Sequence, residues 1–161
     1  QVHSLPNKNV EGAIYTCKKL KKEYPSVKFR AFGVKKYHKL PDFIEFTENP
    51  SDEKLTNIYS TSDIFLFSSR HEGFGSPPSE AMACKCAIVA NKVAAIPEYS
   101  EHMKTAIHAD PDDKDGLYKG AKFLLDNPGK LKEISEAAYI HIREFMNWDN
   151  SIIHFEKFIS K

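Results

Sequence analysis

The chain has 161 residues, enough for one well-buried domain, and its formal net charge is only +1. This charge balance gives no reason to expect a nucleic-acid partner. No apolar run reaches the ~18 residues of a membrane span, and no signal peptide precedes the first expected helix. We therefore expect a cytoplasmic protein.

The first half of the chain shows alternating helical and strand patterns. Apolar residues at helical spacing predict a helix over about 9–24. Alternating side chains predict a strand over 27–32, and a polar loop separates it from a second short strand over 43–46. Ser51 is expected to cap a helix that runs to about Thr61.

The second half continues the alternation and then becomes helical. Strands are expected over 63–68, which is buried, over 87–90 and over 105–108. A helix is expected from 77, and a brief turn or helix at 97–98. From 113 onward the chain is expected to be helical, with a break at 128–129 and an aromatic stripe over 148–158 at its end.

Strands that alternate with helices indicate right-handed βαβ units and a parallel sheet with helices on both faces. We therefore expect an α/β, Rossmann-like domain. In such sheets ligands bind outside the carboxyl ends of the strands, where the loop over 69–76 is expected to lie. Gln1-Val2-His3 resembles the end of a strand, which predicts that the chain is a fragment of a longer protein.

Residues 72–80 read Glu-Gly-Phe-Gly-Ser-Pro-Pro-Ser-Glu. We expect Ser76 to cap the following helix with its hydroxyl, and Pro77 to occupy the first helical position. A strand, a glycine turn and a helix start make an anion-binding corner. Glu72 and Glu80 would repel a phosphate at close range, so we expect them to accept hydrogen bonds from neutral hydroxyls beside it. A nucleotide, a sugar phosphate or a nucleotide sugar has both kinds of group.

Five segments together carry a family resemblance, and they lie at 59–63, 69–75, 78–84, 96–98 and 145–148. On these residues the chain resembles the C-terminal half of a retaining glycosyltransferase of the two-domain GT-B architecture, in glycosyltransferase family 4. The resemblance covers nearly the whole chain. It implies that residues 1–161 form the nucleotide-sugar-binding domain, and that a final helix over about 148–160 crosses towards an N-terminal domain.

The resemblance also implies a role for each site residue. Glu80 matches the glutamate that holds the ribose hydroxyls, and Glu72 matches the catalytic-site glutamate that contacts the donor sugar. Lys8 matches the basic residue that neutralises the diphosphate leaving group. The backbone that faces sugar and diphosphate is that of Gly73, Phe74, Gly75 and Ser76.

The chain departs from the family pattern at several positions. His3 stands where an arginine is common, which leaves phosphate stabilisation to Lys8. Arg70 is a second candidate for this role, but no motif assigns it. Lys85 replaces a glycine, and a left-handed conformation there costs roughly 1 kcal/mol. A second glycine position, a pair before Pro97, is occupied by Ala94-Ala95.

Other features keep two interpretations. His71 lines the cleft or is a polar loop residue, and Phe74 plugs the core or contacts a ligand. The basic run over 18–22 is a solvated helix face or a docking patch for an anionic membrane surface. Cys17, Cys84 and Cys86 have no metal spacing, so we expect buried free thiols in a reducing compartment.

As a whole, the resemblance implies an enzyme that transfers a sugar from a nucleotide sugar to a glycan or lipid-linked acceptor. The acceptor would be bound by an N-terminal domain, and the full protein could associate peripherally with the cytoplasmic face of the membrane. We expect no metal, no cofactor and no activity from the fragment alone. The alternative is a non-catalytic nucleotide-sugar-binding or scaffolding module of the same fold, and a nucleotide-sugar epimerase ranks lower.

Overall fold

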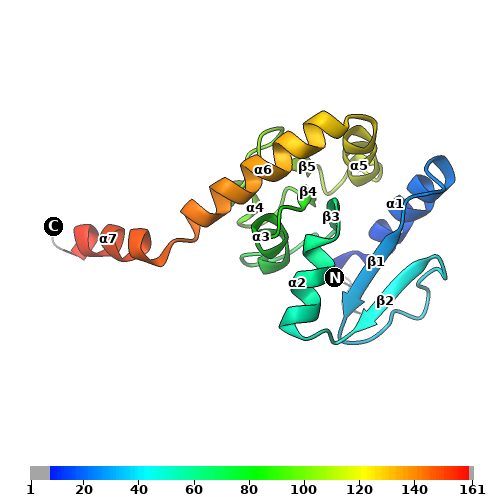
Figure 1. Cartoon of the computed structure of the whole chain (residues 1–161), viewed down its shortest axis with the longest axis horizontal. Coiled ribbons are helices and arrows are strands. Elements are labelled where there is room, and N and C mark those ends of the chain that lie inside the picture. The colour runs from blue at the N-terminus through cyan, green and yellow to red at the C-terminus, as the bar shows by residue number, and fades with distance from the viewer. Residues whose placement is uncertain (1–7, 160–161) are drawn as a thin grey trace.

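The structure is a computed structural model that describes residues 8–159. Within these residues the strands form two parallel sheets with helices packed around them (Figure 1). One sheet pairs β1 with β2, and the other has the order β3-β4-β5. The strands are β1 (Phe29–Gly33), β2 (Ile44–Glu48), β3 (Ile64–Phe67), β4 (Ala87–Asn91) and β5 (Ile107–Ala109). The parallel, helix-covered architecture is confirmed, although it is divided into two sheets.

The expected helices are also present. They are α1 (Val10–Glu23), α2 (Asp52–Ser60), α3 (Ser76–Ala83), α4 (Ile96–Tyr99), α5 (Gly116–Asp126), α6 (Pro128–Phe145) and α7 (Trp148–Ile159). Pro128 both separates α5 from α6 and begins α6, because proline is favoured in the first helical turn.

The caps of two helices test the sequence predictions. Ser51 caps α2 as expected, since its hydroxyl accepts a hydrogen bond from the Lys54 N–H at 3.4 Å. The prediction that Ser76 caps α3 is wrong. Gly75 is the N-cap residue, with φ 81° and ψ 59°, and Ser76 is the first helical residue. The chain enters α3 through a left-handed conformation, which favours glycine at the residue before the serine.

The core lies around β4, whose five residues are all buried. Ile88 and Ala90 join a cluster with Met82 of α3 and Ile142 of α6. Ala87 and Val89 point into the other cluster, which includes Ile107, Leu117 and Leu124. This alternation places helices on both faces of the three-stranded sheet, as period-two side-chain direction requires.

The β1–β2 sheet has a smaller apolar cluster of its own, which includes Ile14 of α1 and Ile44 of β2. Between β1 and β3 lies a cavity of about 440 Å³, lined largely by apolar side chains such as Phe32 and Phe65. The Phe32 and Phe65 rings are nevertheless stacked, with centroids 6.4 Å apart, and α1 packs against α5, so strand side chains and helices both join the two sheets.

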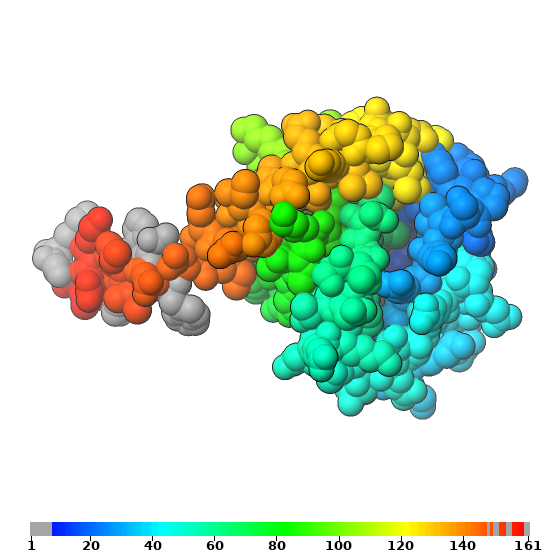
Figure 2. Space-filling model, in the orientation of Figure 1, coloured from blue at the N-terminus to red at the C-terminus, as the bar shows by residue number. Residues whose placement is uncertain are grey.

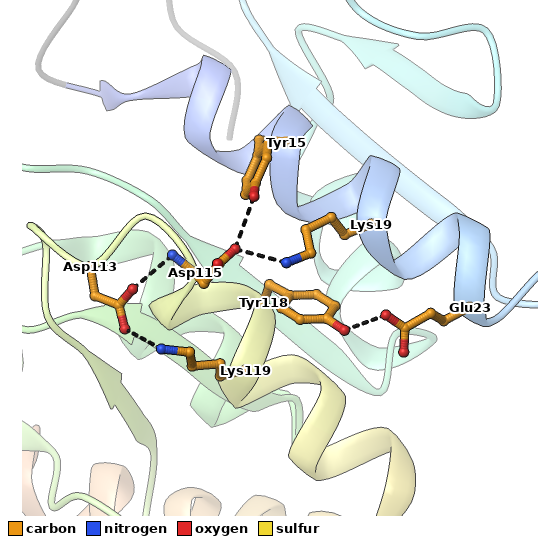
Figure 3. Close-up of polar contacts among 7 residues, drawn as sticks. All are labelled: Tyr15, Lys19, Glu23, Asp113, Asp115, Tyr118 and Lys119. Atoms are coloured by element: carbon orange, nitrogen blue, oxygen red, sulfur yellow. Dashed lines mark hydrogen bonds and ion pairs between the residues drawn. The ribbon is translucent and has the colours of Figure 1, made fainter.

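A polar seam joins α1 to α5 (Figure 3). Asp115 accepts hydrogen bonds from the Tyr15 hydroxyl at 3.0 Å and from the Lys19 ammonium at 2.9 Å. The Tyr118 hydroxyl donates to Glu23, and the Lys19 ammonium lies 3.8 Å from the centroid of the Tyr118 ring. The basic run over 18–22 is thus more than a solvated face, because Lys19 belongs to this seam.

The cysteines are free thiols. Cys86 is buried, while Cys17 and Cys84 are half-buried. Burial raises the pKa of the Cys17 thiol to about 12. A thiol with that pKa is uncharged at neutral pH.

The last helix, α7, extends away from the rest of the molecule (Figure 2). Its apolar residues Ile152, Ile153, Phe158 and Ile159 are exposed. Trp148 and Phe155 of the aromatic stripe lie in α7, but the structure does not describe their side chains. Over 8–159, no helix is both long enough and apolar enough to cross a membrane.

Candidate functional site

The candidate site lies at the carboxyl ends of β3 and β4. Ser68 directly follows β3, and its hydroxyl donates to the Lys8 carbonyl at 2.9 Å. Asn91, the last residue of β4, donates its amide N–H groups to the carbonyls of Ser68 at 2.8 Å and Ser69 at 3.1 Å. These bonds fix the start of the loop after β3 and tie the residues before α1 to it.

The structure brings Lys8 and Glu72 together, although 64 positions separate them in the sequence. The Lys8 Nζ lies 2.5 Å from the Glu72 Oε1, and their side chains are only 21% and 13% exposed. A charge-assisted hydrogen bond with so little solvent access is one of the stronger polar contacts available to a protein. The two residues assigned to different parts of a donor are thus ion-paired with each other.

The glycine loop lies between Glu72 and α3, and there is free space around Gly73 at its start but close packing around Gly75 at its end. A Cβ at Gly73 would meet nothing within 4 Å, whereas a Cβ at Gly75 would lie 3.0 Å from the Ile96 Cδ1. Phe74 is 39% exposed, and its ring lies over Tyr99 with centroids 5.0 Å apart. Phe74 is therefore no core plug, and its ring stays accessible beside the loop.

The N-terminus of α3 follows this loop directly. The first N–H groups of a helix have no partner within the helix, and the dipole makes that end positive. Lys8 carries a positive charge near the same loop, and the paired Glu72 carboxylate balances that charge. The end of α3 is thus the net source of positive potential, and Lys8 adds to it only when its ammonium pairs with an anion other than Glu72.

Glu80 lies on α3 and is exposed. The hydroxyl of buried Tyr59 donates to its Oε2 at 3.1 Å. Burial raises the pKa of Tyr59, and the nearby Glu80 charge raises it further, so the phenol remains a donor. Tyr59 therefore holds an exposed carboxylate in one orientation.

The structure does not bring the remaining described candidates, Arg70 and His71, into the Lys8–Glu72 pair. Arg70 donates to the Pro111 carbonyl at 2.6 Å and pairs with Asp112, so its charge is already used by the loop after β5. His71 is exposed. His3, proposed to stand in for an arginine, lies outside the described residues.

Sequence reasoning did not assign roles to four residues that shape the site. They are Tyr59, Ser68, Asn91 and Tyr99. Tyr59, Ser68 and Tyr99 donate hydrogen bonds to Glu80, Lys8 and Gly75 in turn, and Asn91 donates to the carbonyls at the start of the loop after β3. Tyr59 belonged to a recognised segment, but its hydroxyl contact with Glu80 depends on how α2 packs beside α3. Only the tertiary arrangement reveals these contacts.

The arrangement suits a ligand that carries both phosphate and hydroxyl groups. The N-terminus of α3 favours a phosphate, which Lys8 can bind in exchange for Glu72, and the carboxylates of Glu72 and Glu80 can then accept hydrogen bonds from hydroxyls. Among residues 8–159, no group of three or more His, Cys, Asp or Glu side chains is placed to hold a metal ion.

Comparisons with known proteins bear on this site. Residues 2–141 match the family model described as "Glycosyl transferases group 1". The serotype-specific mannosyltransferase WbdA of Escherichia coli is 32% identical over an alignment of 107 residues that covers 58% of this chain and 13% of that protein. The chain therefore spans only a small part of this curated relative.

Two solved structures share the fold. The C-terminal domain of the glycosyl transferase group 1 family protein LpcC from Francisella tularensis has a TM-score of 0.78 and 22% identity, covering 87% of this chain and 80% of that one. HepE from Anabaena, solved in complex with UDP, has a TM-score of 0.83 and 17% identity, covering 99% of this chain and 47% of that one.

Proposed function

The chain belongs to the group 1 glycosyl transferases and has the Rossmann-like fold of one GT-B half, and on this premise we propose that it is the donor-binding domain of a retaining glycosyltransferase. In the intact protein it binds a nucleotide sugar, whose hexosyl group passes to a glycan or lipid-linked acceptor. The mannosyltransferase relative and the UDP complex of a structural neighbour support this class of donor.

The observation that carries the proposal is the Lys8–Glu72 ion pair beside the glycine loop. A bound diphosphate offers Lys8 a second anionic partner. Glu72 is then free to accept hydrogen bonds from the donor sugar's hydroxyls. As the bond between sugar and phosphate breaks, negative charge grows on the diphosphate, and Lys8 stabilises it together with the N-terminus of α3.

Glu80 holds the ribose in this proposal. A carboxylate has enough lone pairs to accept hydrogen bonds from two neighbouring hydroxyls while one oxygen also accepts the Tyr59 hydroxyl. The backbone of Gly73, Phe74, Gly75 and Ser76 lies between the ribose and sugar positions and faces the diphosphate. No metal or cofactor has a part in the proposal.

The rest of the active site lies outside this chain. We propose that an N-terminal domain binds the acceptor and that α7 crosses towards it, which would cover the exposed Phe158 and Ile159. The isolated chain is expected to bind nucleotide weakly and to transfer nothing. A cytoplasmic location, with peripheral attachment to the membrane face, belongs to the same proposal.

The test is a calorimetric titration of the intact protein with UDP, GDP and dTDP. We expect one of them to bind, and Glu80→Ala to weaken that binding at least about tenfold, because hydrogen bonds to a charged group contribute about 1.5–3 kcal/mol each. Glu53→Ala, at an exposed position on α2, is the matched control. Equal affinities of wild type and Glu80→Ala for all three nucleotides would refute the assignment of Glu80.

A further inference from the structure

The segment that forms α4 donates hydrogen bonds to two carbonyl groups of the glycine loop. The Tyr99 hydroxyl donates to the Gly75 carbonyl at 2.9 Å. The Ala95 N–H donates to the Gly73 carbonyl at 3.4 Å. Two alternate carbonyls of the loop therefore point towards the same segment.

The direction of a carbonyl fixes the direction of the next N–H. In a trans peptide the C=O of one residue and the N–H of the next point in opposite directions, and no peptide bond among the described residues is cis. With the Gly75 carbonyl turned towards Tyr99, the Ser76 N–H points away from α4. The same argument applies to the Phe74 N–H, through the weaker Ala95 contact.

Tyr99 is well fixed for this task. Its side chain is fully buried and packs against the rings of Phe74 and Phe145, with centroid distances of 5.0 and 6.3 Å. Burial raises the pKa of Tyr99, and the charge of Glu72 adds to the effect, so the hydroxyl keeps its proton. The donor is therefore rigid and always available.

Gly75 completes the arrangement. It has φ 81°, and a Cβ there would lie 3.3 Å from the Tyr99 hydroxyl oxygen. A glycine therefore lets the hydroxyl approach the loop backbone closely, in a conformation that other residues adopt only with strain.

We propose that Tyr99 is a positioning residue, whose hydrogen bond to the Gly75 carbonyl aims the Ser76 N–H at the diphosphate of the donor. The inference rests on the proposed function and adds to it a residue that acts through the loop backbone without touching the ligand. It also separates two buried tyrosines by role, because Tyr59 donates to the ribose-binding Glu80 instead.

The experiment compares Tyr99→Phe with Tyr59→Phe in the intact protein. Both variants keep the aromatic ring and lose one hydroxyl. Calorimetry measures binding of UDP, GDP and dTDP and of the matching nucleosides uridine, guanosine and thymidine. We expect Tyr99→Phe to weaken diphosphate binding about three- to tenfold and leave nucleoside binding unchanged, as loss of one hydrogen bond implies. Tyr59→Phe should weaken both.

Two results would overturn the role of Tyr99 while leaving the proposed function intact. One is a Tyr99→Phe protein that binds the nucleoside diphosphate as tightly as wild type. The other is an equal loss for nucleoside and diphosphate, which would mean a general structural role. The proposed function fails as well if, for all three bases, wild type binds the nucleoside at least as tightly as the nucleoside diphosphate.

A second measurement needs no variant. Inorganic pyrophosphate is titrated into the isotope-labelled wild-type protein, and backbone amide shifts are followed by NMR. The Ser76 amide should shift among the most strongly, because a hydrogen bond to phosphate acts directly on its proton. A Ser76 amide that does not respond, while other loop amides do, contradicts the proposed direction of this N–H.

Discussion

Glu72→Gln should tighten the binding of a nucleoside diphosphate while it lowers turnover. In the structure the Lys8 ammonium lies 2.5 Å from the Glu72 carboxylate, so a diphosphate that binds to Lys8 has to compete with Glu72 for it. The substitution keeps the size of the side chain and removes its charge. Lys8 is then free to pair with phosphate, but the donor sugar loses a charged acceptor for its hydroxyls.

The magnitude follows from the geometry of the pair. At 2.5 Å the Coulomb attraction is about 2 kcal/mol at the dielectric constant of water and about 7 kcal/mol at an effective value of about 20. Desolvation offsets much of this, and a net contribution of about 1.5–3 kcal/mol is typical of a hydrogen bond to a charged group. Removal of the competition should therefore strengthen diphosphate binding by about ten- to 150-fold.

Calorimetry with the nucleoside diphosphate that binds wild type measures this change, and single-turnover transfer by the intact protein measures the loss of chemistry. Lys8→Met is the matched control, because it removes the other member of the pair and should weaken diphosphate binding. If Glu72→Gln binds diphosphate no more tightly than wild type, then the ion pair does not compete with the ligand and the reasoning fails.

Further predictions concern stability, measured by denaturant unfolding. Gly75→Ala should destabilise the protein by about 1–3 kcal/mol, because φ is 81° and the new Cβ would lie 3.0 Å from Ile96 Cδ1. Gly73→Ala is the control. Its Cβ would meet nothing within 4 Å, so its unfolding free energy should stay within about 1 kcal/mol of wild type. Thr16→Val should stabilise the protein by about 1 kcal/mol, because the fully buried Thr16 hydroxyl has no hydrogen-bond partner; an unchanged or lower unfolding free energy would contradict the assigned cost of that hydroxyl.

Local patterns were sufficient to predict most of the fold. Apolar periodicity, together with capping residues and prolines, located the described helices and strands to within a few residues, and the alternation of strands with helices indicated the parallel architecture. Lys85, which stands at a glycine position of the family pattern, has the left-handed conformation that is costly for a lysine, with φ 61°. These features depend on neighbouring residues, so a single sequence contains the information they need.

The parts that could not be predicted depend on packing between distant elements. Ser76 followed by Pro77 is a good capping sequence, but Gly75 is the N-cap in a left-handed conformation, and the Tyr99 hydroxyl donates to its carbonyl. Pairing of Lys8 with Glu72 depends on where α1 begins relative to β3. The division into two sheets likewise follows from which strands pair, and periodicity does not contain that information.

The site is sensitive to ionic strength in two ways, and the second of them acts through the polar seam between α1 and α5. Added salt screens the attraction between Lys8 and a diphosphate directly. It also screens the ion pair between Lys19 and Asp115, whose side chains are about one-third exposed. Because α1 follows Lys8, weakening of the seam loosens the helix that places this lysine. Salt can therefore alter the geometry of the site as well as its charge.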